Sequence, residues 1–211
     1  MNFKQDAYAK QAESIIKNLK RRNMDGYYFE NKEDCVKTIM EQIPSKSVVS
    51  WGGSETLKES GILTKLSEQD YTLIDRSKAN SPEESRNLFA QAVLSDYYFM
   101  STNTITLDGQ LINIDGNGNR VACLIQGPSK VIIIAGMNKV AVDVESGIKR
   151  IRNFASPANA VRLNKNIPCS ITGKCEDCLS PECFCNQIVI TRRSGHIGRI
   201  HVYLIGQELG Y

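Results

Sequence analysis

Five of the seven cysteines in this 211-residue chain lie in one short stretch that runs from Cys169 to Cys185. At its centre Cys175 and Cys178 form a C-x-x-C pair, a spacing that lets two sulfurs converge on one ion. Together with Cys169 and Cys185 they supply four thiolates, which suit Zn²⁺ or a [4Fe–4S] cluster equally well. Cys183 is an alternate to Cys185, because residues two apart on an extended chain point the same way. We therefore expect a metal centre here. The alternatives are free thiols in a surface loop, or disulfides formed after purification.

The cellular setting bears on the use of these thiols. The first 22 residues are polar and lack the apolar core of a signal peptide, and no apolar run approaches the length of a membrane span. We expect a cytoplasmic protein, in which thiols stay reduced, with no membrane partner. The net charge of +3 is spread along the chain, so nucleic acid is not an expected partner. Cys35 and Cys123 stand alone in apolar surroundings and are expected to be small buried hydrophobes.

The first of three polar candidate segments is Gly52-Gly53-Ser54, between a predicted strand and a predicted helix. Such a turn directs backbone N–H groups at one point, which suits an anion. The alternative is a tight turn with a serine cap, and the two interpretations are about equally supported.

The second segment, from Asp115 to Asn119, is rich in glycine and asparagine. Gly116 and Gly118 begin the dinucleotide pattern G-x-G-x-x-G, but Val121 occupies its third glycine position, so no NAD is expected. A calcium loop fails because Arg120 stands where glycine is needed. What remains is a polar turn at a sheet end, where ligands bind in open α/β sheets. A plain loop of turn-forming residues is the alternative.

The third segment places Asn138 and Lys139 directly after an apolar strand. A lysine there can reach a phosphate or a carboxylate, although most lysines are simply solvated. We predict one cleft in which Lys139 pairs with ligand charge and Asp115 orients a hydroxyl or serves as a base. The ligand-binding residues expected around it are Gly52, Gly53, Ser54, Asn103, Gly116, Asn117, Gly118, Asn119 and Asn138.

Strands alternate with amphipathic helices along most of the chain, which predicts an α/β fold with a mainly parallel sheet. The first helix should bury Ala12, Ile15, Ile16 and Leu19. Val131–Ala135 is wholly apolar, as in a strand that is covered on both faces. Residues 155–168 look irregular. Gln187–Arg192 and Arg199–Ile205 look like a β-hairpin. The expected division is an α/β domain over residues 1–164, with residues 165–211 packed on it as a cysteine-rich segment and hairpin.

The order of these elements resembles the lactate-utilisation (LUD) domain family, most closely its short members. The segments that carry the likeness are WGGSETL, LIDR, TNTITLDGQLINIDGNGNRVA, VIIIAGMNKV, IRNFASPANAVRL and VYLIGQELGY. The resemblance implies a fold like that of ribose-5-phosphate isomerase, glucosamine-6-phosphate deaminase and the CoA transferases. It also implies ligand binding where glycine-rich strand ends meet, and cysteines matching 169, 175, 178 and 185, with Cys183 as an addition.

The same resemblance implies a role as a subunit or accessory of L-lactate or 2-hydroxy-acid oxidation, with iron–sulfur oxidoreductase partners. A stand-alone enzyme acting on a phosphorylated or CoA-linked small molecule is a second hypothesis. A non-catalytic metal-binding regulatory protein is a third. A small anionic substrate is the expected ligand, and the sequence leaves open whether the chain is an enzyme and whether it forms a homodimer.

Overall fold

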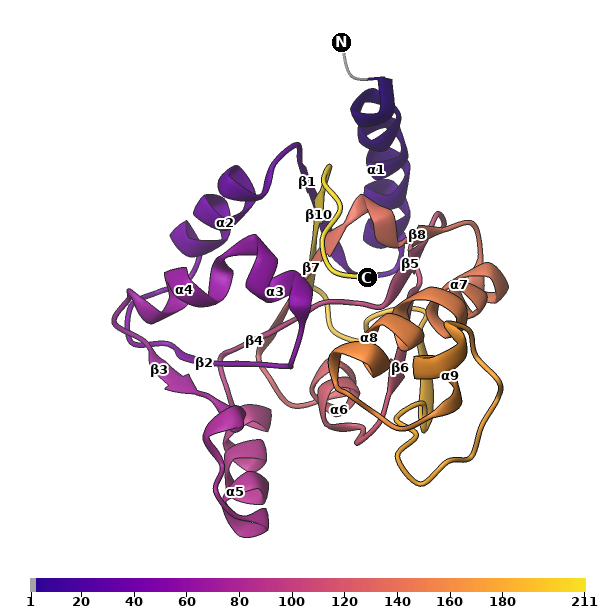
Figure 1. Cartoon of the computed structure of the whole chain (residues 1–211). Helices are drawn as coiled ribbons and strands as arrows, with labels where there is room; N and C mark the ends of the chain where they lie inside the picture. Colours follow the sequence, from indigo (N-terminus) through magenta and orange to yellow (C-terminus); the bar gives the residue numbers. More distant parts are fainter. Residues whose placement is uncertain (1–2) are drawn as a thin grey trace.

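A computed structural model describes residues 3–211 and shows an α/β architecture built on a six-stranded sheet (Figure 1). All neighbouring strands in this sheet are parallel, in the order β1-β10-β7-β4-β2-β3. The strands are β1 (Asp25–Phe29), β2 (Val48–Trp51), β3 (Thr72–Ile74), β4 (Tyr97–Met100), β7 (Lys130–Gly136) and β10 (Ile200–Ile205). The parallel sheet flanked by helices that the sequence predicts is therefore confirmed.

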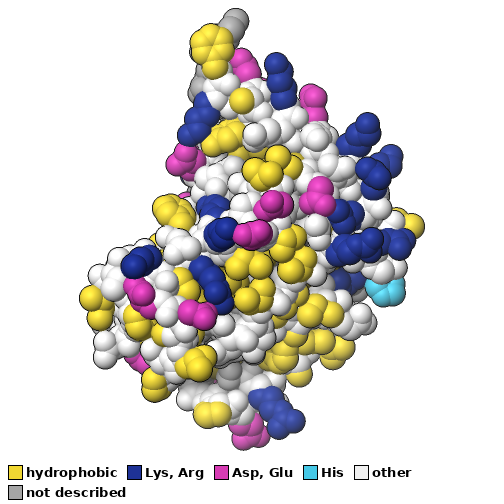
Figure 2. All heavy atoms as spheres, turned by 90° about the vertical axis from the view of Figure 1, so that its right-hand side faces the viewer, with side chains coloured by type: hydrophobic (Ala, Val, Ile, Leu, Met, Phe, Trp, Pro, Cys, Tyr) yellow, Lys and Arg dark blue, Asp and Glu magenta, His cyan; other side chains and the backbone are white. Residues whose placement is uncertain are grey.

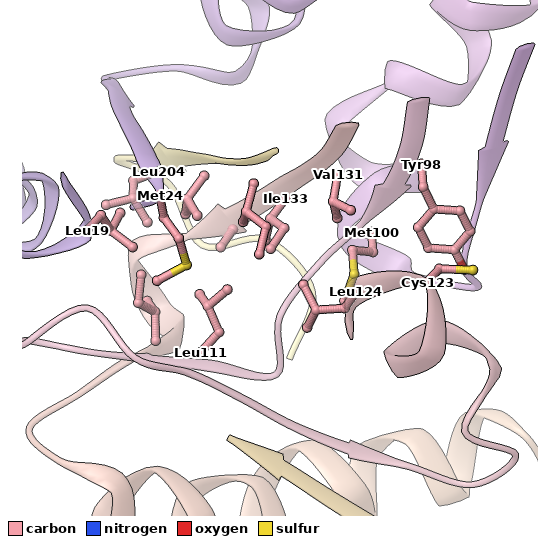
Figure 3. Close-up of a cluster of buried hydrophobic side chains, with 14 of the residues drawn as sticks. Leu19, Met24, Tyr98, Met100, Leu111, Cys123, Leu124, Val131, Ile133 and Leu204 are labelled. Carbon is pink, nitrogen blue, oxygen red and sulfur yellow. The ribbon is translucent and has the colours of Figure 1, made fainter. Parts of the chain in front are cut away.

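Alternate residues of the central strands enter two separate cores. Val131 and Ile133 of β7 face one core, and Ile132 and Ile134 face the other. This is why the apolar run of β7 has no polar face: a parallel strand in the middle of the sheet is covered on both sides. Figure 3 shows the first core, in which Val131 and Ile133 lie among apolar side chains from other parts of the chain, including Leu19 and Leu124.

Helices cover both faces of the sheet. The helices are α1 (Phe3–Arg21), α2 (Lys32–Glu41), α3 (Glu55–Ser60), α4 (Ile62–Ser67), α5 (Pro82–Val93), α6 (Asn119–Ile125), α7 (Val144–Arg150), α8 (Ser156–Arg162) and α9 (Pro168–Thr172). α2, α3 and α4 contribute to one core, and α1, α5 and α6 contribute to the other. In α1 the predicted stripe is buried at Ala12, Ile15 and Leu19 and half-buried at Ile16.

A second sheet of four strands packs beside the first, in the order β8-β5-β6-β9. Its strands are β5 (Thr104–Thr106), β6 (Leu111–Asp115), β8 (Val140–Ala141) and β9 (Gln187–Thr191). Leu111 of β6 and Ile105 of β5 join the same core as α1. The turn between β5 and β6 has Gly109 at a φ of +84°, as expected for an Asp-Gly turn. Asp115 is the last residue of β6 in this sheet.

The predicted C-terminal hairpin is wrong. β9 pairs antiparallel with β6 in the second sheet, whereas β10 lies in the main sheet between β1 and β7. The burial of the two strands explains the difference. β10 is buried at five of its six positions, while no residue of β9 is fully buried. A strand that is apolar on both faces is stabilised by a central position in a parallel sheet, not by one partner in a hairpin.

The prediction of irregular structure for residues 155–168 is wrong for residues 155–162 and holds for residues 163–167. A π-helical turn over Ile151–Ala155 leads into α8, which has Pro157 in its first turn. Of the residues of α8, only the small or polar side chains Ser156, Pro157 and Ala160 are buried. Without large apolar residues at helical spacing, the segment carries no amphipathic signal.

The right-hand side of Figure 1, where α7 lies, faces the viewer in Figure 2. Hydrophobic side chains gather near the centre of this face, with charged side chains of both signs around them (Figure 2). Within residues 3–211, no helix has the length and apolar character needed to cross a membrane.

Candidate functional site

A cavity of about 560 Å³ lies at the carboxyl ends of the main-sheet strands. The segments that follow β2, β3, β4, β7 and β10 all contribute to its wall, together with the end of β6 and α8. Because parallel strands end at the same edge, residues far apart in sequence meet there. This is the place where the sequence predicts a cleft.

Most of the predicted cleft residues line this cavity. They are Gly53, Ser54, Asn103, Asp115, Gly116, Asn117, Asn119 and Lys139. Ser54 and Lys139 therefore lie on the same side of the sheet, as the predicted site requires. The hydroxyl of Ser54 also caps α3 by accepting a hydrogen bond from the backbone N–H of Leu57.

Three predicted ligand-binding residues, Gly52, Gly118 and Asn138, are not part of the cavity lining but contact residues that are. A side chain at Gly52 would come within 3.1 Å of the Tyr98 hydroxyl and of Arg120. Gly118 has a φ of +76° and donates its N–H to the carboxylate of Asp115. Asn138 accepts a hydrogen bond from the Leu209 N–H and donates one to the carbonyl of Gly210, so it anchors the segment after β10.

Lys139 is the central charged group of the site. It follows β7 in a short 3₁₀ turn, and only 4% of its surface is exposed. Its ammonium donates to the Ser101 hydroxyl at 3.3 Å, and no carboxylate within residues 3–211 forms an ion pair with it. A buried ammonium without a counter-ion is costly, which makes this lysine a candidate to bind an anion.

The surroundings of Lys139 lower its pKa to about 7, compared with an ordinary value of 10.5. Desolvation is the largest cause, and the positive charges of Arg150 and Arg120 add to it, while Glu59 opposes it. Strong pKa perturbation in a cleft is typical of functional sites. An anion bound beside Lys139 would stabilise its charged form.

Asp115 is held by its neighbours more firmly than the sequence suggests. One carboxylate oxygen accepts the N–H of Gly118 at 2.8 Å, and the other lies 3.2 Å from Nε of Arg120. Arg120 also donates to the side-chain oxygens of Asn103 and Asn113 and to the carbonyls of Ser101 and Ile114. The pair therefore ties the ends of β4 and β6 together. Each carboxylate oxygen can still accept a second hydrogen bond, which suits orientation of a ligand hydroxyl.

Sequence reasoning did not identify several further residues of the cavity wall. They are Arg76, Ser101, Thr102, Ser156, Asn159, Arg162 and Tyr211. Arg162 pairs with Glu55 at 3.3 Å and donates to the Tyr211 hydroxyl at 2.6 Å. Arg76 directly follows a predicted strand and belongs to the LIDR segment, so its position at a strand end was the available signal.

The cysteine-rich segment forms one side of the cavity. Pro181, Glu182, Cys183 and Phe184 line it, and Phe184 packs so closely on Gly116 that a side chain there would come within 3.0 Å. Glu182 holds the segment in place by pairing with Lys165 at 3.2 Å. A change in the conformation of this segment would therefore alter the shape of the cavity.

The five thiols of the segment occupy related environments. Cys169 is buried and the other four are half-buried. The sulfur of Cys175 accepts the N–H of Asp177 at 3.4 Å, and that of Cys183 accepts the N–H of Cys185 at 3.5 Å.

Cys185 differs from the other cysteines of the segment. Its sulfur donates to the Ser156 hydroxyl at 3.5 Å, and burial raises its pKa to about 11. Among residues 3–211, no three His, Cys, Asp or Glu side chains are grouped so that they could hold a metal ion. The geometry therefore does not support the expected metal centre on Cys169, Cys175, Cys178 and Cys185, with Cys183 as alternate, and that centre stays a prediction. Cys35 and Cys123 are fully buried, as predicted.

The chain is similar to known proteins in sequence and in fold. The sequence model of the LUD domain family matches residues 12–205 of this chain. The crystal structure of a DUF162 family protein from Deinococcus radiodurans is similar in fold, with a TM-score of 0.51 and 11% sequence identity over 96% of this chain and 98% of that one. A structure of eIF2B delta from Chaetomium thermophilum matches 53% of this chain and 48% of its own, at 11% identity and a TM-score of 0.35. A search of curated proteins finds no match.

Proposed function

Because the chain belongs to the LUD domain family, we propose that it binds a small 2-hydroxy acid, or the corresponding 2-oxo acid, in the cavity at the strand ends. Family membership supports a role related to lactate utilisation at the level of the family. In this role the chain is a substrate-binding subunit or accessory of 2-hydroxy-acid oxidation.

The observation that carries the proposal is the buried Lys139 ammonium, which lines the cavity without a carboxylate partner in the described chain. A ligand carboxylate supplies the missing negative charge, in surroundings where a charge-assisted hydrogen bond is stronger than in water. The polar groups that converge around it favour a ligand with a hydroxyl or keto oxygen next to that carboxylate. Asp115, positioned by Arg120 and Gly118, can accept a hydrogen bond from such a hydroxyl.

Oxidation of a 2-hydroxy acid removes a proton from the hydroxyl, together with the C2 hydrogen and its two bonding electrons. In the proposal the electrons pass to a partner oxidoreductase, and an iron–sulfur protein is the expected class of partner. The cysteine-rich segment is a candidate holder of a soft metal centre in the same system. The chemistry of its donors suits zinc or an iron–sulfur cluster, and amide N–H groups already point at the sulfurs of Cys175 and Cys183.

The direct test is calorimetric titration of the purified protein with L-lactate near pH 6.5. Propionate lacks the hydroxyl of lactate, and lactamide lacks its charge, so the two compounds separate the contributions of these groups. We expect lactate to bind best and lactamide to bind weakly or not at all. Lys139→Met should weaken lactate binding at least tenfold, or by about 1.4 kcal/mol.

The matched control is Lys149→Met. Lys149 lies on α7, is exposed, and pairs with Glu145 instead of lining the cavity. We expect this variant to bind lactate like the wild type. Equal binding of lactate and lactamide, or equal effects of the two lysine substitutions, would contradict the proposed role of Lys139.

A further inference from the structure

The charged side chains of the cavity wall fall into two groups. Three cations are paired with carboxylates: Arg120 with Asp115, Arg162 with Glu55 and Lys165 with Glu182. Two other cations of the wall, Lys139 and Arg76, have no ion-pair partner within residues 3–211. A cavity that neutralises most of its own charges but not these two has two positions that favour negative charge.

Arg76 is half-buried and packs against an aromatic ring. Its guanidinium carbon lies 5.8 Å from the centre of the Phe89 ring, so the aromatic face of α5 supports it. Its Nε and Nη1 atoms are buried and have no hydrogen-bond partner within residues 3–211. Buried donors without acceptors destabilise a structure, and a charged donor does so more than a neutral one. Arg76 lines the cavity, so an oxyanion at this end would supply acceptors after a small turn of the guanidinium.

The sheet topology sets the distance between the two cations. Lys139 follows β7 and Arg76 follows β3, and the order β7-β4-β2-β3 places three strand spacings between these strands. At about 4.8 Å per spacing, the two strand ends lie roughly 14 Å apart. Both side chains border the cavity between these ends. A three-carbon acid bound at Lys139 would leave the Arg76 end of the site free.

We propose that the cavity binds an elongated 2-hydroxy acid with a second oxyanion, which contacts Lys139 through its carboxylate and Arg76 through a terminal phosphate or carboxylate. The assignment of the Lys139 end rests on the function proposed above. The volume of about 560 Å³ is that of sites for ligands much larger than lactate. A guanidinium presents paired donors that match phosphate and carboxylate oxygens, so Arg76 favours either group over a hydroxyl.

The test compares acids that differ only in the second anionic group. Glycerate and gluconate are 2-hydroxy acids, and 3-phosphoglycerate and 6-phosphogluconate are the same acids with a terminal phosphate. 2-Hydroxyglutarate provides the dicarboxylate. Titration of the full chain at pH 6.5 should show that 3-phosphoglycerate or 6-phosphogluconate binds tenfold or more tightly than its parent acid, or that 2-hydroxyglutarate binds tenfold or more tightly than glycerate. The member of the series that gains most reports the distance between the two subsites.

Two substitutions of Arg76 separate its charge from its packing. Arg76→Gln should remove the gain from the second anion, so that each phosphorylated acid binds within about twofold of its parent acid in this variant. Arg76→Lys should restore part of the gain. Thermal unfolding of both variants checks that the fold persists. If the role of Arg76 is only structural, both substitutions should lower the stability of the protein and weaken the binding of all the acids alike. That result would overturn the inference.

Inorganic phosphate, used alone as a probe, distinguishes failure of this inference from failure of the proposed function. If the acids do not bind, but phosphate binds and Arg76→Gln abolishes that binding, the proposed function fails while the Arg76 oxyanion subsite stands. If glycerate binds through Lys139 and a second anion adds no affinity, the proposed function stands and the Arg76 subsite is refuted. If phosphate binds equally to wild type and Arg76→Gln, the subsite is also refuted.

Discussion

Nε of Arg120 lies 3.2 Å from a carboxylate oxygen of Asp115, and both side chains are largely buried in the wall of the cavity. The ammonium of Lys139, in the same wall, has only the Ser101 hydroxyl as a hydrogen-bond partner within the described chain. The first arrangement is a closed network that fixes the backbone at two strand ends. The second leaves a charge uncompensated. The two cations are therefore expected to respond differently to substitution.

Arg120→Met should destabilise the fold by about 3–5 kcal/mol, because it leaves the buried carboxylate of Asp115 without its counter-ion and several oxygens without a donor. Urea unfolding followed by circular dichroism measures the change. Arg86→Met, at an exposed position of α5, is the control and should alter stability by less than about 0.5 kcal/mol. Similar losses in the two variants would show that the Arg120 network contributes little.

Lys139→Met should have the opposite effect on stability. The native pKa of about 7 lies below the ordinary value of 10.5, so between these pH values the unfolded chain binds a proton that the native protein does not. Stability of the wild type is therefore penalised most at or below pH 7, and it recovers as the pH rises toward 10.5. The variant should be more stable near pH 6, by up to about 5 kcal/mol.

The pH dependence provides the check on this prediction. The difference in the free energy of unfolding between Lys139→Met and wild type should shrink steadily from pH 7 to pH 10. Urea titrations at four pH values, with Lys149→Met as the matched exposed lysine, would measure it. A difference that stays constant with pH would mean that the native pKa of Lys139 is not lowered.

Gly136→Ala should disrupt the segment after β10. An added methyl group would lie 2.6 Å from the carbonyl oxygen of Gln207 and 2.7 Å from the backbone nitrogen of Leu209, so backbone atoms would have to move. We expect a loss of at least about 2 kcal/mol, together with weaker ligand binding, because Gly210 and Tyr211 line the cavity. Gly195→Ala, where nothing lies within 4 Å, is the control and should be nearly neutral.

Protein purified without oxygen should contain zinc or iron at close to one site per chain if the cysteine-rich segment holds a metal centre. Elemental analysis and a visible absorption spectrum distinguish zinc from an iron–sulfur cluster. The double variant Cys175→Ser/Cys178→Ser should lose the metal and keep its folded core. Because β10 lies inside the main sheet, removal of the metal should loosen residues 165–186 and leave β10 in place. Metal-free protein from anaerobic cells would refute this prediction.

Local patterns in the sequence determined much of the fold. The apolar run of β7 predicts a strand that is covered on both faces, and the polar side chains of Asn31 and Ser81 cap α2 and α5 by accepting N–H groups three residues on. Placement of glycine-rich and polar segments after strands was enough to predict a cleft at Ser54 and Lys139. These features depend on interactions between residues that are close in the chain, which is why they can be recognised without a structure.

The tertiary structure alone decided how distant segments meet. Nothing near β10 indicates that it pairs with β1 and β7, because strand pairing over such sequence separations leaves no local pattern, and the hairpin prediction failed for this reason. The same pairing brings Gly210 to the cavity, and the path of the chain after β3 brings Arg76 to its far end. Residue types indicated which groups could bind an anion. Which of them remain without a counter-ion depends on the neighbours that folding provides, and this distinguishes Lys139 and Arg76 from Arg120.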